Sequence, residues 1–423
     1  MLGRLRIKRA THLKGNGFGR VNHAAASQQQ VGRKEHIDYL FVCPSLLEPA
    51  SKRGGGIEEV DFQVATHLPE SYHIVILGAF LATFRKRIPA APNVLIEFVG
   101  FPAPRSYPPS SKGEVFWMTV LGMPLFSIPL LVKLVSLRRA RPACLVVHNG
   151  LPGLLACFVY QRSTTRIVYS EGNVYPWVNP FPSVIRRSIP QRGMRLFKII
   201  TGRIIGKLAW CIRAQSEAIK RGLASNAVSG YKTTVIPGGV DPSFYLPTRN
   251  VRNDETIGVG FVGRLDDAKG APLLLEIVAL ASRTQSRLKF VILGEGLIKS
   301  KLKEFANVEH VGWVDRDQLR EKLSAVSIVL TFQKEFGLGE LEAMATAKAI
   351  VASNKGEVSK IIKDRDNGLL CDTTPESYVS CINELINDPG LLARVSARAR
   401  ETVVERFSWQ TIAREWLRMT LID

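Results

Sequence analysis

Two series of short apolar runs, one in each half of the chain, constrain the fold most strongly. Each run is followed by a turn and a helical pattern, and the helical patterns 271–283, 317–325 and 340–347 separate the later runs. This order predicts βαβ units and parallel sheets. The expected strands are 37–43, 74–77, 145–148 and 166–169 in the first half, and 258–262, 289–293, 327–330 and 349–352 in the second. We expect an α/β fold of two facing Rossmann-like, doubly wound domains, with ligands bound in the interdomain cleft at the carboxyl ends of the strands.

The length of 423 residues suits two such domains and smaller additions. A proline and two glycines interrupt the periodic pattern near 235–239, which favours a link between the domains there. We therefore place an N-terminal domain at 36–235 and a C-terminal domain at 236–405. Residues 406–423 are expected to form a C-terminal helix that packs back on the N-terminal domain.

The formal net charge of +20, from 57 Lys or Arg against 37 Asp or Glu, is concentrated in two stretches. Residues 1–34 and residues 172–216 each carry eight Lys or Arg and no acid. The first stretch is poor in large apolar residues, so residues 1–35 are expected to be a disordered basic tail. In the second, cations alternate with apolar residues at helical spacing over 186–213. Two interpretations remain open: a helix on an anionic membrane surface, or a domain-packing helix with a solvated basic face.

Other features exclude several classes of protein. Residues 115–131 carry no charge, but a bilayer span needs about 20 apolar residues and this run contains Pro124 and Pro129. We expect a buried helix here, with interfacial contact as the alternative. The six Cys form no Cys-x-x-Cys pair and no cluster with His, which excludes a zinc ribbon and favours the reducing cytoplasm. The aromatic residues form no stacking platform, so nucleic acid is not an expected partner.

Two glycine-containing turns are candidate phosphate-binding loops. Three successive glycines, Gly54, Gly55 and Gly56, follow two cations and lead into a helical pattern, which suits close approach of a ligand to a helix N-terminus. A flexible surface turn is the alternative. In the second half, Gly263 and Arg264 directly follow a strand, and Lys269 precedes the next helix. The two cations suit a diphosphate, with a pair of unrelated surface cations as the alternative.

The stretch 334–345 is the most informative, because two glycines precede a helix expected to begin near Glu340. A carboxylate here suits paired sugar hydroxyls, since an ionised acid is a strong bidentate acceptor. Capping of the first helical turn by Glu340 and Glu342 is the alternative. His148 ends an apolar strand, and it is either structural or directed into the proposed cleft.

Taken in order, the motifs resemble those of the retaining glycosyltransferases of the GT-B fold, most closely the large family numbered four. The resemblance covers roughly residues 37–418. It rests on Gly54-Gly55-Gly56-Ile57-Glu58, Val147-His148, Gln215-Ser216-Glu217, Ile236-Pro237-Gly238-Gly239-Val240-Asp241, Gly263-Arg264, Lys269-Gly270, Phe336-Gly337-Leu338, Glu342-Ala343-Met344-Ala345, Asn367-Gly368-Leu369 and Phe407-Ser408-Trp409.

The resemblance implies a role for each matching position. Arg264 and Lys269, beside Gly263, correspond to the pair that offsets charge on the leaving nucleoside diphosphate. Glu342 corresponds to the acid that holds the ribose hydroxyls, and His148 to a histidine close to the transferred sugar. The loop of Gly54, Gly55 and Gly56 would contact phosphate or acceptor, and Phe336, Gly337 and Leu338 would lie near the donor sugar. The resemblance also implies retention of anomeric configuration, and neither a metal nor another cofactor.

Two positions depart from the family pattern. Lys334 stands where the family has an acid, so either Glu335 takes that role or the donor-sugar contact is altered. A later family acid aligns with Lys360. The sequence therefore predicts a glycosyltransferase that uses a nucleotide-sugar donor, with an inactive nucleotide-sugar-binding protein of the same fold as the alternative. The expected acceptor is a glycan or a lipid-linked molecule, and the expected location is the cytoplasm or the inner face of the membrane.

Overall fold

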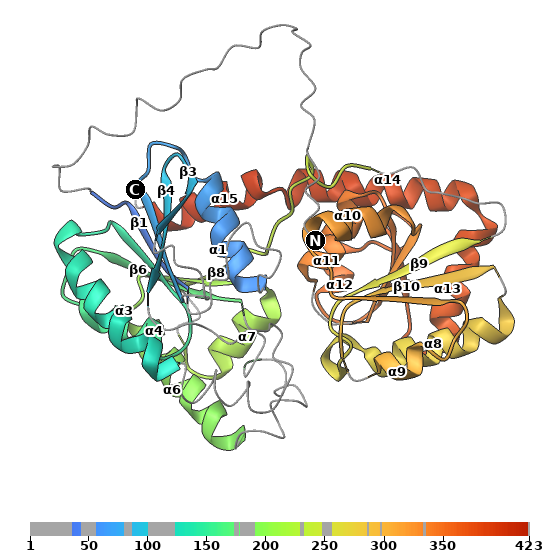
Figure 1. Cartoon of the computed structure of the whole chain (residues 1–423), viewed down its shortest axis with the longest axis horizontal. Helices are drawn as coiled ribbons and strands as arrows, with labels where there is room; N and C mark the ends of the chain where they lie inside the picture. The colour runs from blue at the N-terminus through green and yellow to red at the C-terminus, as the bar shows by residue number, and fades with distance from the viewer. Residues whose placement is uncertain are drawn as a thin grey trace, which may run out of the picture. The chain divides into compact units, whose positions relative to one another are not determined.

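The computed structural model contains two sheets, one in each half of the chain, the first mainly and the second wholly parallel (Figure 1). It describes residues 36–43, 56–79, 87–99, 123–172, 177, 191–228, 232–247, 256–285, 287–296, 298–332 and 336–421. The expected basic tail lies outside these residues, as do Gly54, Gly55, Lys334 and Glu335.

The first half forms an eight-stranded sheet with the order β3-β4-β2-β1-β5-β6-β7-β8. Every pair is parallel except β3 with β4. The strands are β1 Tyr39–Cys43, β2 Ile74–Ala79, β3 Arg87–Ala91, β4 Val94–Val99, β5 Cys144–Val147, β6 Arg166–Glu171, β7 Cys211–Ala214 and β8 Thr233–Val235. The central position of β1 explains its composition, because all five of its residues are buried.

Alternating residues of β1 pack on opposite faces of this sheet. Leu40 and Val42 belong to a core with α3, α4, α6 and α7, whereas Phe41 belongs to a core with α1 and α15. Helix α15 is anchored by Trp416, whose ring lies 6.3 Å from that of Phe41. The helices on these two faces are α1 Gly56–His67, α3 Met123–Leu137, η2 Arg138–Ala140, α4 Leu151–Tyr160, α6 Gln191–Leu208, α7 Glu217–Ser225 and α15 Trp409–Thr420.

The second half forms a six-stranded, wholly parallel sheet with the order β11-β10-β9-β12-β13-β14. Its strands are β9 Ile257–Val262, β10 Leu288–Leu293, β11 Val308–Gly312, β12 Ile328–Thr331, β13 Ala349–Ser353 and β14 Leu369–Cys371. One core includes α8 and α13, and the other includes α10, α11, α12 and α14. The helices are η4 Asp267–Lys269, α8 Ala271–Thr284, α9 Lys299–Leu302, α10 Arg316–Ser324, α11 Leu338–Ala345, α12 Val358–Ile361, α13 Pro375–Asn387 and α14 Pro389–Arg406.

The order of strands places a topological switch point between β9 and β12. The chain passes from β9 to β10 on one side, and it returns to the other side of β9 to form β12. Adjacent loops diverge at such a point, and ligands of doubly wound sheets bind there, outside the carboxyl ends of the strands. Loop 263–270 follows β9, and the stretch that leads to α11 follows β12.

All eight predicted strands are present within one or two residues, but two helix predictions need correction. Helix α11 begins at Leu338 rather than near Glu340. The amphipathic helix proposed over 186–213 occupies Gln191–Leu208 among the described residues, and Cys211–Ala214 is strand β7. Arg213 is consequently not part of a basic surface: it is fully buried, which lowers its pKa to about 10, and its Nε donates to the Ile236 carbonyl at 2.6 Å.

The helix expected to be buried over 115–131 also differs from the prediction. Residues 115–122 lie outside the described residues, and α3 has one buried edge, which includes Leu130 and Leu134. Ile128, Val132 and Val135 are 67%, 68% and 55% exposed, so the helix is half-buried. In the part of the chain that the structure describes, no helix has both the length and the apolar character needed to cross a bilayer.

Candidate functional site

The loop after β9 brings the two predicted diphosphate-binding cations together. Asp266 joins them, because its Oδ2 accepts a hydrogen bond from Arg264 Nε at 2.8 Å and its Oδ1 accepts one from the Lys269 backbone N–H at 3.1 Å. The Lys269 side chain lies against Gly263: a Cβ added to that glycine would be 3.7 Å from Lys269 Cδ. Gly263 has a φ of +148°, which favours glycine. Arg264 is half exposed, so its guanidinium faces a region that a ligand reaches from solvent.

A second glycine supports this loop, and the sequence alone did not assign it a role in the site. Gly294 follows β10 with a φ of +150°, and a Cβ there would lie only 1.8 Å from the Gly263 carbonyl oxygen. The Gly263 N–H donates to Leu293 O, and the Leu265 N–H donates to Glu295 O, each at 2.9 Å. The turn after β10 therefore fixes the backbone from which Arg264 projects.

Glu342 lies on α11, beyond the neighbouring strand β12. Tyr245 Oη donates a hydrogen bond to its Oε1 at 2.9 Å. Burial raises the pKa of Glu342 to about 7, although the Tyr245 hydrogen bond and the Arg316 charge act in the opposite direction. The carboxyl group therefore titrates near neutral pH. The Tyr245 contact occupies one oxygen of the group that the resemblance assigns to ribose.

Glu340 has the capping role that was the alternative for this stretch. Its Oε2 accepts a hydrogen bond from the Gly337 backbone N–H at 3.1 Å, and its Oε1 accepts one from Thr331 Oγ1 at 2.9 Å. The side chain is buried and joins the N-terminus of α11 to the end of β12. The two acids of the motif thus have different environments: Glu340 fixes the helix start, and Glu342 faces Tyr245.

Arg316 is a site residue that sequence reasoning missed. It begins α10, and its guanidinium lies 5.0 Å from the ring centre of Phe244 and 5.8 Å from that of Tyr245. Its Nη1 also lies 3.3 Å from Glu59 of α1, so one cation contacts residues of both halves of the chain. No motif signals Arg316, because Tyr245 and Glu59, which it contacts, are about 70 and 260 residues away in sequence.

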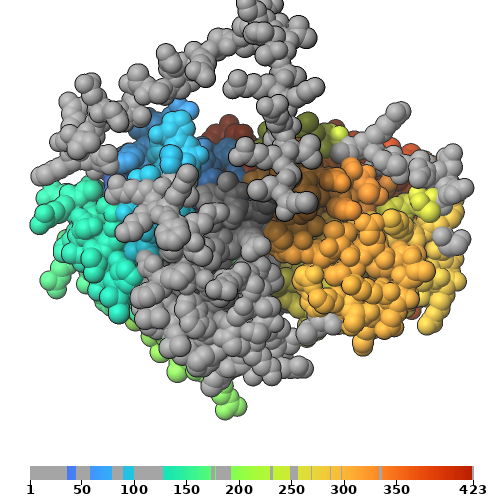
Figure 2. All heavy atoms as spheres, viewed as in Figure 1, coloured from blue at the N-terminus to red at the C-terminus, as the bar shows by residue number. Residues whose placement is uncertain are grey.

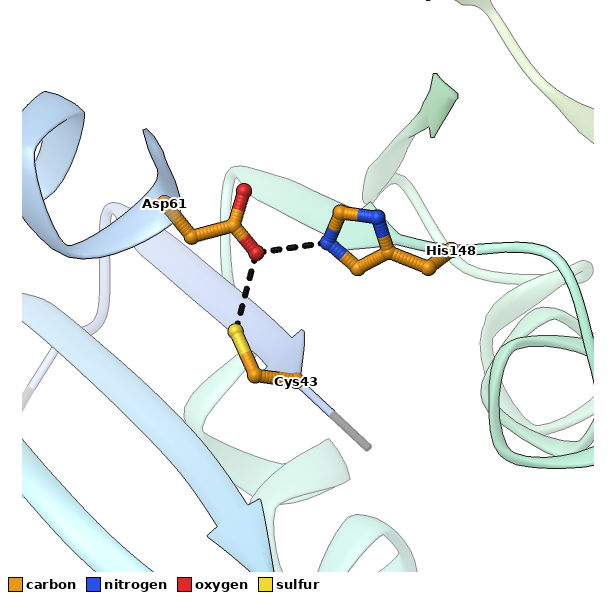
Figure 3. A group of neighbouring side chains, drawn as sticks. All are labelled: Cys43, Asp61 and His148. Carbon is orange, nitrogen blue, oxygen red and sulfur yellow. Dashed lines mark hydrogen bonds and ion pairs between the residues drawn. The ribbon is translucent and has the colours of Figure 1, made fainter. Parts of the chain in front are cut away.

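His148 directly follows β5, and it is buried (Figure 3). Its Nε2 lies 2.5 Å from Asp61 Oδ2, and the Cys43 thiol donates to the same oxygen at 2.9 Å. Burial alone lowers the pKa of His148, but the charge of Asp61 and the hydrogen bond to it outweigh burial and raise that pKa above its usual value. Asp61 lies in the middle of α1, and nothing in its sequence context distinguished it from a solvent-facing helix residue.

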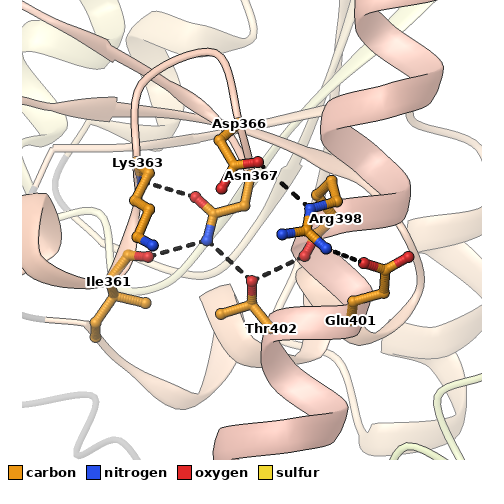
Figure 4. Close-up of polar contacts among 7 residues, drawn as sticks. All are labelled: Ile361, Lys363, Asp366, Asn367, Arg398, Glu401 and Thr402. Atoms are coloured by element: carbon orange, nitrogen blue, oxygen red, sulfur yellow. Dashed lines mark hydrogen bonds and ion pairs between the residues drawn. The ribbon is translucent and has the colours of Figure 1, made fainter.

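The Asn-Gly turn of the resemblance is architectural (Figure 4). Asn367 Nδ2 donates to the Ile361 carbonyl and to Thr402 Oγ1, each at 3.0 Å, and its Oδ1 accepts the Lys363 N–H at 2.7 Å. These bonds tie the turn before β14 to α14. Lys360 is the second departure from the family pattern, and its Nζ lies 3.2 Å from Glu357 Oε2.

The remaining predicted site residues are described only in part. Gly56 begins α1, which agrees with a glycine turn that leads into a helix. Gly337 precedes α11, and Phe336 and Leu338 pack against the core that contains Tyr245. Leu338 also limits the space beside the link between the halves, because a Cβ on Gly238 would lie 2.8 Å from Leu338 Cδ2. Gly54, Gly55 and Glu335 lie outside the described residues.

Comparison with known proteins supports the fold and the family resemblance. Residues 246–402 match the family model described as Glycosyl transferases group 1. An uncharacterized glycosyltransferase of Methanocaldococcus jannaschii is 30% identical over 175 residues, which make up 39% of this chain and 44% of that protein. The matched segments span less than half the length of the first three curated relatives.

Among the similar solved structures, two that each match 90% of this chain illustrate the fold. Sucrose-phosphate synthase from Thermosynechococcus elongatus is similar with a TM-score of 0.70 and 18% identity, and the match covers 90% of this chain and 98% of that one. Anabaena HepE, solved with UDP and glucose, has a TM-score of 0.65 and 19% identity, and covers 90% and 99%. The predicted fold of two Rossmann-like domains, as in the GT-B enzymes, is confirmed.

Proposed function

We propose that this chain, whose residues 246–402 match the glycosyl transferases group 1 family model, transfers a sugar from a nucleotide-sugar donor to an acceptor with retention of anomeric configuration. The observation that carries the proposal is the switch point of the second sheet. Arg264 and Lys269 lie on the loop after β9, and Glu342 lies beyond the adjacent β12. Two cations and a carboxyl group at neighbouring strand ends match the diphosphate and the ribose of one donor.

The chemistry follows from these charges. The bond between the anomeric carbon and the diphosphate oxygen breaks, and the acceptor oxygen forms the new bond on the same face of the sugar. The diphosphate leaves with the electron pair of the broken bond. The proton of the acceptor hydroxyl passes to an oxygen of this departing diphosphate. Arg264 and Lys269 stabilise the negative charge that develops on it, where fixed cations act most effectively. We propose that neither a metal nor another cofactor takes part.

An inactive sugar-nucleotide-binding protein is the second candidate, because Lys334 stands at an acidic position of the family pattern. A thermal-shift screen with UDP-, GDP- and ADP-sugars, followed by product analysis with the donor that binds, separates the two. Stabilisation together with release of the nucleoside diphosphate supports the enzyme. Stabilisation without hydrolysis or transfer supports the inactive protein.

Replacement of Tyr245 with Phe tests the ribose site. The Tyr245 hydroxyl favours the ionised form of Glu342, so the Tyr245→Phe variant should raise the pKa of Glu342 above about 7. Less carboxylate is then available to accept bonds from the ribose hydroxyls at neutral pH. We expect the donor Kd at pH 7 to increase roughly threefold to tenfold, with a smaller difference from the wild type at pH 9. An equal loss at both pH values would contradict this account, and isothermal titration calorimetry measures both.

We further propose that the acceptor is carried by a membrane, because α3, α4 and α6 expose apolar side chains. Helix α3 packs on α4, and α4 packs on α6, so the three helices lie side by side on one face of the first sheet (Figure 1). The teal atoms of α3 and α4 lie at the surface of the molecule in Figure 2. The large apolar residues of these helices that are more than one-third exposed are Ile128, Leu131, Val132 and Val135 of α3, Phe158 of α4, and Leu196, Phe197 and Ile200 of α6.

The charge around this apolar face suits an anionic surface. Residues 115–216 contain 14 Lys or Arg and a single acid, Glu171, which is buried in β6. Exposed cations flank the apolar residues of α6 and follow α3; they are Arg192, Arg195, Arg203, Lys207, Arg138, Arg139 and Arg141. Each cation near an anionic bilayer contributes about 1 kcal/mol, and each inserted large apolar side chain adds about 1.5–3 kcal/mol.

A vesicle experiment tests this surface. The test uses strongly anionic vesicles with about 30% phosphatidylglycerol. The triple variant Val132→Ser, Phe197→Ser, Ile200→Ser should bind them at least tenfold more weakly than the wild type. Binding should also decrease as salt is raised, because the cations are screened. The matched control replaces exposed apolar residues elsewhere, Leu246, Trp313 and Val404, with Ser. Equal binding by the wild type and both triple variants would remove the membrane proposal.

A further inference from the structure

Cys43, Asp61 and His148 form a buried cluster at the carboxyl end of the first sheet (Figure 3). Cys43 ends β1, Asp61 projects from α1, and His148 follows β5. Cys43 and His148 contact the same oxygen of Asp61: His148 Nε2 lies 2.5 Å and Cys43 Sγ 2.9 Å from Asp61 Oδ2. Ligands of one tetrahedral zinc ion lie more than about 3 Å from each other, since each is about 2.0–2.3 Å from the metal. The spacing is therefore that of a hydrogen-bonded cluster.

The two contacts define which atoms carry protons. Burial, together with the charge of Asp61, raises the pKa of the Cys43 thiol well above its usual value, so Cys43 is a neutral donor. His148 Nε2 donates the second hydrogen bond, because an ionised carboxylate oxygen has no proton and can only accept. The acids that surround the imidazole are Asp61 and Glu58 of α1 and Glu171 of β6, and each of them favours the protonated ring. The raised pKa of His148 favours the form of the ring in which both nitrogens carry a proton.

His148 Nδ1 faces away from Asp61 and has no hydrogen-bond partner among the described residues (Figure 3). His148 is only 7% exposed, so an unpaired N–H here is costly. The main chain of His148 is also closely packed against the start of α4. Helix α4 begins so close to it that a Cβ on Gly153 would lie 2.0 Å from the His148 carbonyl oxygen. A fixed donor without a protein acceptor is the arrangement expected where a ligand supplies the acceptor.

We propose that Asp61 is a positioning residue that fixes His148 through Nε2 so that Nδ1–H donates to a hydroxyl oxygen of the transferred sugar. This inference rests on the proposed transferase function. Asp61 does not contact substrate; it sets the orientation and the proton content of the ring that does. The bond to Nδ1 orients the sugar, and no proton is transferred through His148.

Replacement of Asp61 with Asn tests the proposal by kinetics. The amide has nearly the same shape but no charge, so the pKa of His148 falls and Nδ1 loses its proton at a lower pH. We expect kcat/KM at pH 8 to fall roughly 10- to 100-fold, the size expected for a lost hydrogen bond to a charged group. The loss should be smaller at pH 6, because the ring is again protonated there. The matched control is Asp38→Asn, because Asp38 immediately precedes β1 and so lies at the opposite end of that strand from Cys43. This variant should keep the wild-type pH profile.

A spectroscopic measurement decides the same point without activity. The chain has seven His, and the signals absent from a His148→Gln variant identify this ring in ¹⁵N spectra of histidine-labelled protein. At pH 7.5, about one pH unit above the usual histidine pKa, we expect both nitrogens of His148 to be protonated in the wild type and not in Asp61→Asn. A neutral ring in the wild type, an unchanged pH profile in Asp61→Asn, or one zinc ion per chain would overturn the proposal. If these spectra are as expected and no donor is consumed, the transferase function fails instead.

Discussion

Joint replacement of Arg264 and Lys269 with Ala should lower kcat by about a thousandfold or more. Removal of one fixed donor that stabilises transition-state charge costs about 10²–10³ in other enzymes, and here two cations on one loop are removed together. Asp266 pre-organises both of them, through the Arg264 side chain and the Lys269 backbone. Single replacements should each cost less than the pair. The measurement is kcat with the donor identified in the thermal-shift screen.

The same replacement should leave the free energy of unfolding nearly unchanged. Arg264 is half exposed, and its ion pair with Asp266 is of the kind that contributes about 1 kcal/mol or less. Lys289 and Lys322 provide a matched control, because both contact Glu309 on the same domain but lie away from the loop after β9. Their joint replacement with Ala should keep kcat within about twofold. A double variant at 264 and 269 that retains wild-type turnover would contradict the assignment of the diphosphate site.

Replacement of Trp416 with Ala should have the largest effect on stability. Trp416 is 1% exposed on α15, in the core that covers one face of the first sheet. Its ring lies 6.3 Å from that of Phe41 and 6.0 Å from the guanidinium of the buried Arg213. Truncation leaves a cavity and exposes a buried cation to it, so we expect a loss of about 3–5 kcal/mol in the free energy of unfolding. Urea denaturation followed by fluorescence measures it.

The matched control for this prediction is Trp313→Ala. Trp313 is 41% exposed, so its truncation should cost about 0.5 kcal/mol or less. The Tyr39 hydroxyl bonds to Thr420 Oγ1 at 2.7 Å, which gives α15 a second contact with β1. Equal stability losses for the two tryptophan variants would show that α15 does not hold the first sheet together.

Strands were the most predictable part of the fold. Strands such as β1 and β12 are buried on both faces and therefore appear as continuous apolar runs bounded by turns. Six of the described strands, β3, β4, β7, β8, β11 and β14, were not predicted. Strand β7 was missed because it follows α6 after only two residues and contains Arg213, whose cation continued the basic pattern of the helix. Helix α3 was predicted to be buried because apolar composition does not distinguish a core helix from one with an exposed apolar face.

The candidate site was predictable where a motif is local and not where the contact is distant. Gly263, Arg264 and Lys269 lie on one loop, so their spacing alone suggested a shared ligand. Tyr245 and Arg316 approach Glu342 from separate elements, and no local pattern marks either residue. Asp61 was missed for the same reason: its partner His148 is 87 residues away, and only the parallel pairing of β1 with β5 brings their surroundings together.

The affinity of the protein for nucleotide sugars, with and without the Glu342 carboxylate, tests the central claim most directly. Titration calorimetry of the wild type and of Glu342→Gln with UDP-, GDP- and ADP-sugars at pH 8 compares the two, at a pH about one unit above the pKa of Glu342. The account predicts that one class of donor binds the wild type and binds Glu342→Gln about tenfold or more weakly. Absence of binding by every donor to the wild type, or equal affinity in the two proteins, would contradict a ribose held by Glu342 beside a diphosphate held by Arg264 and Lys269.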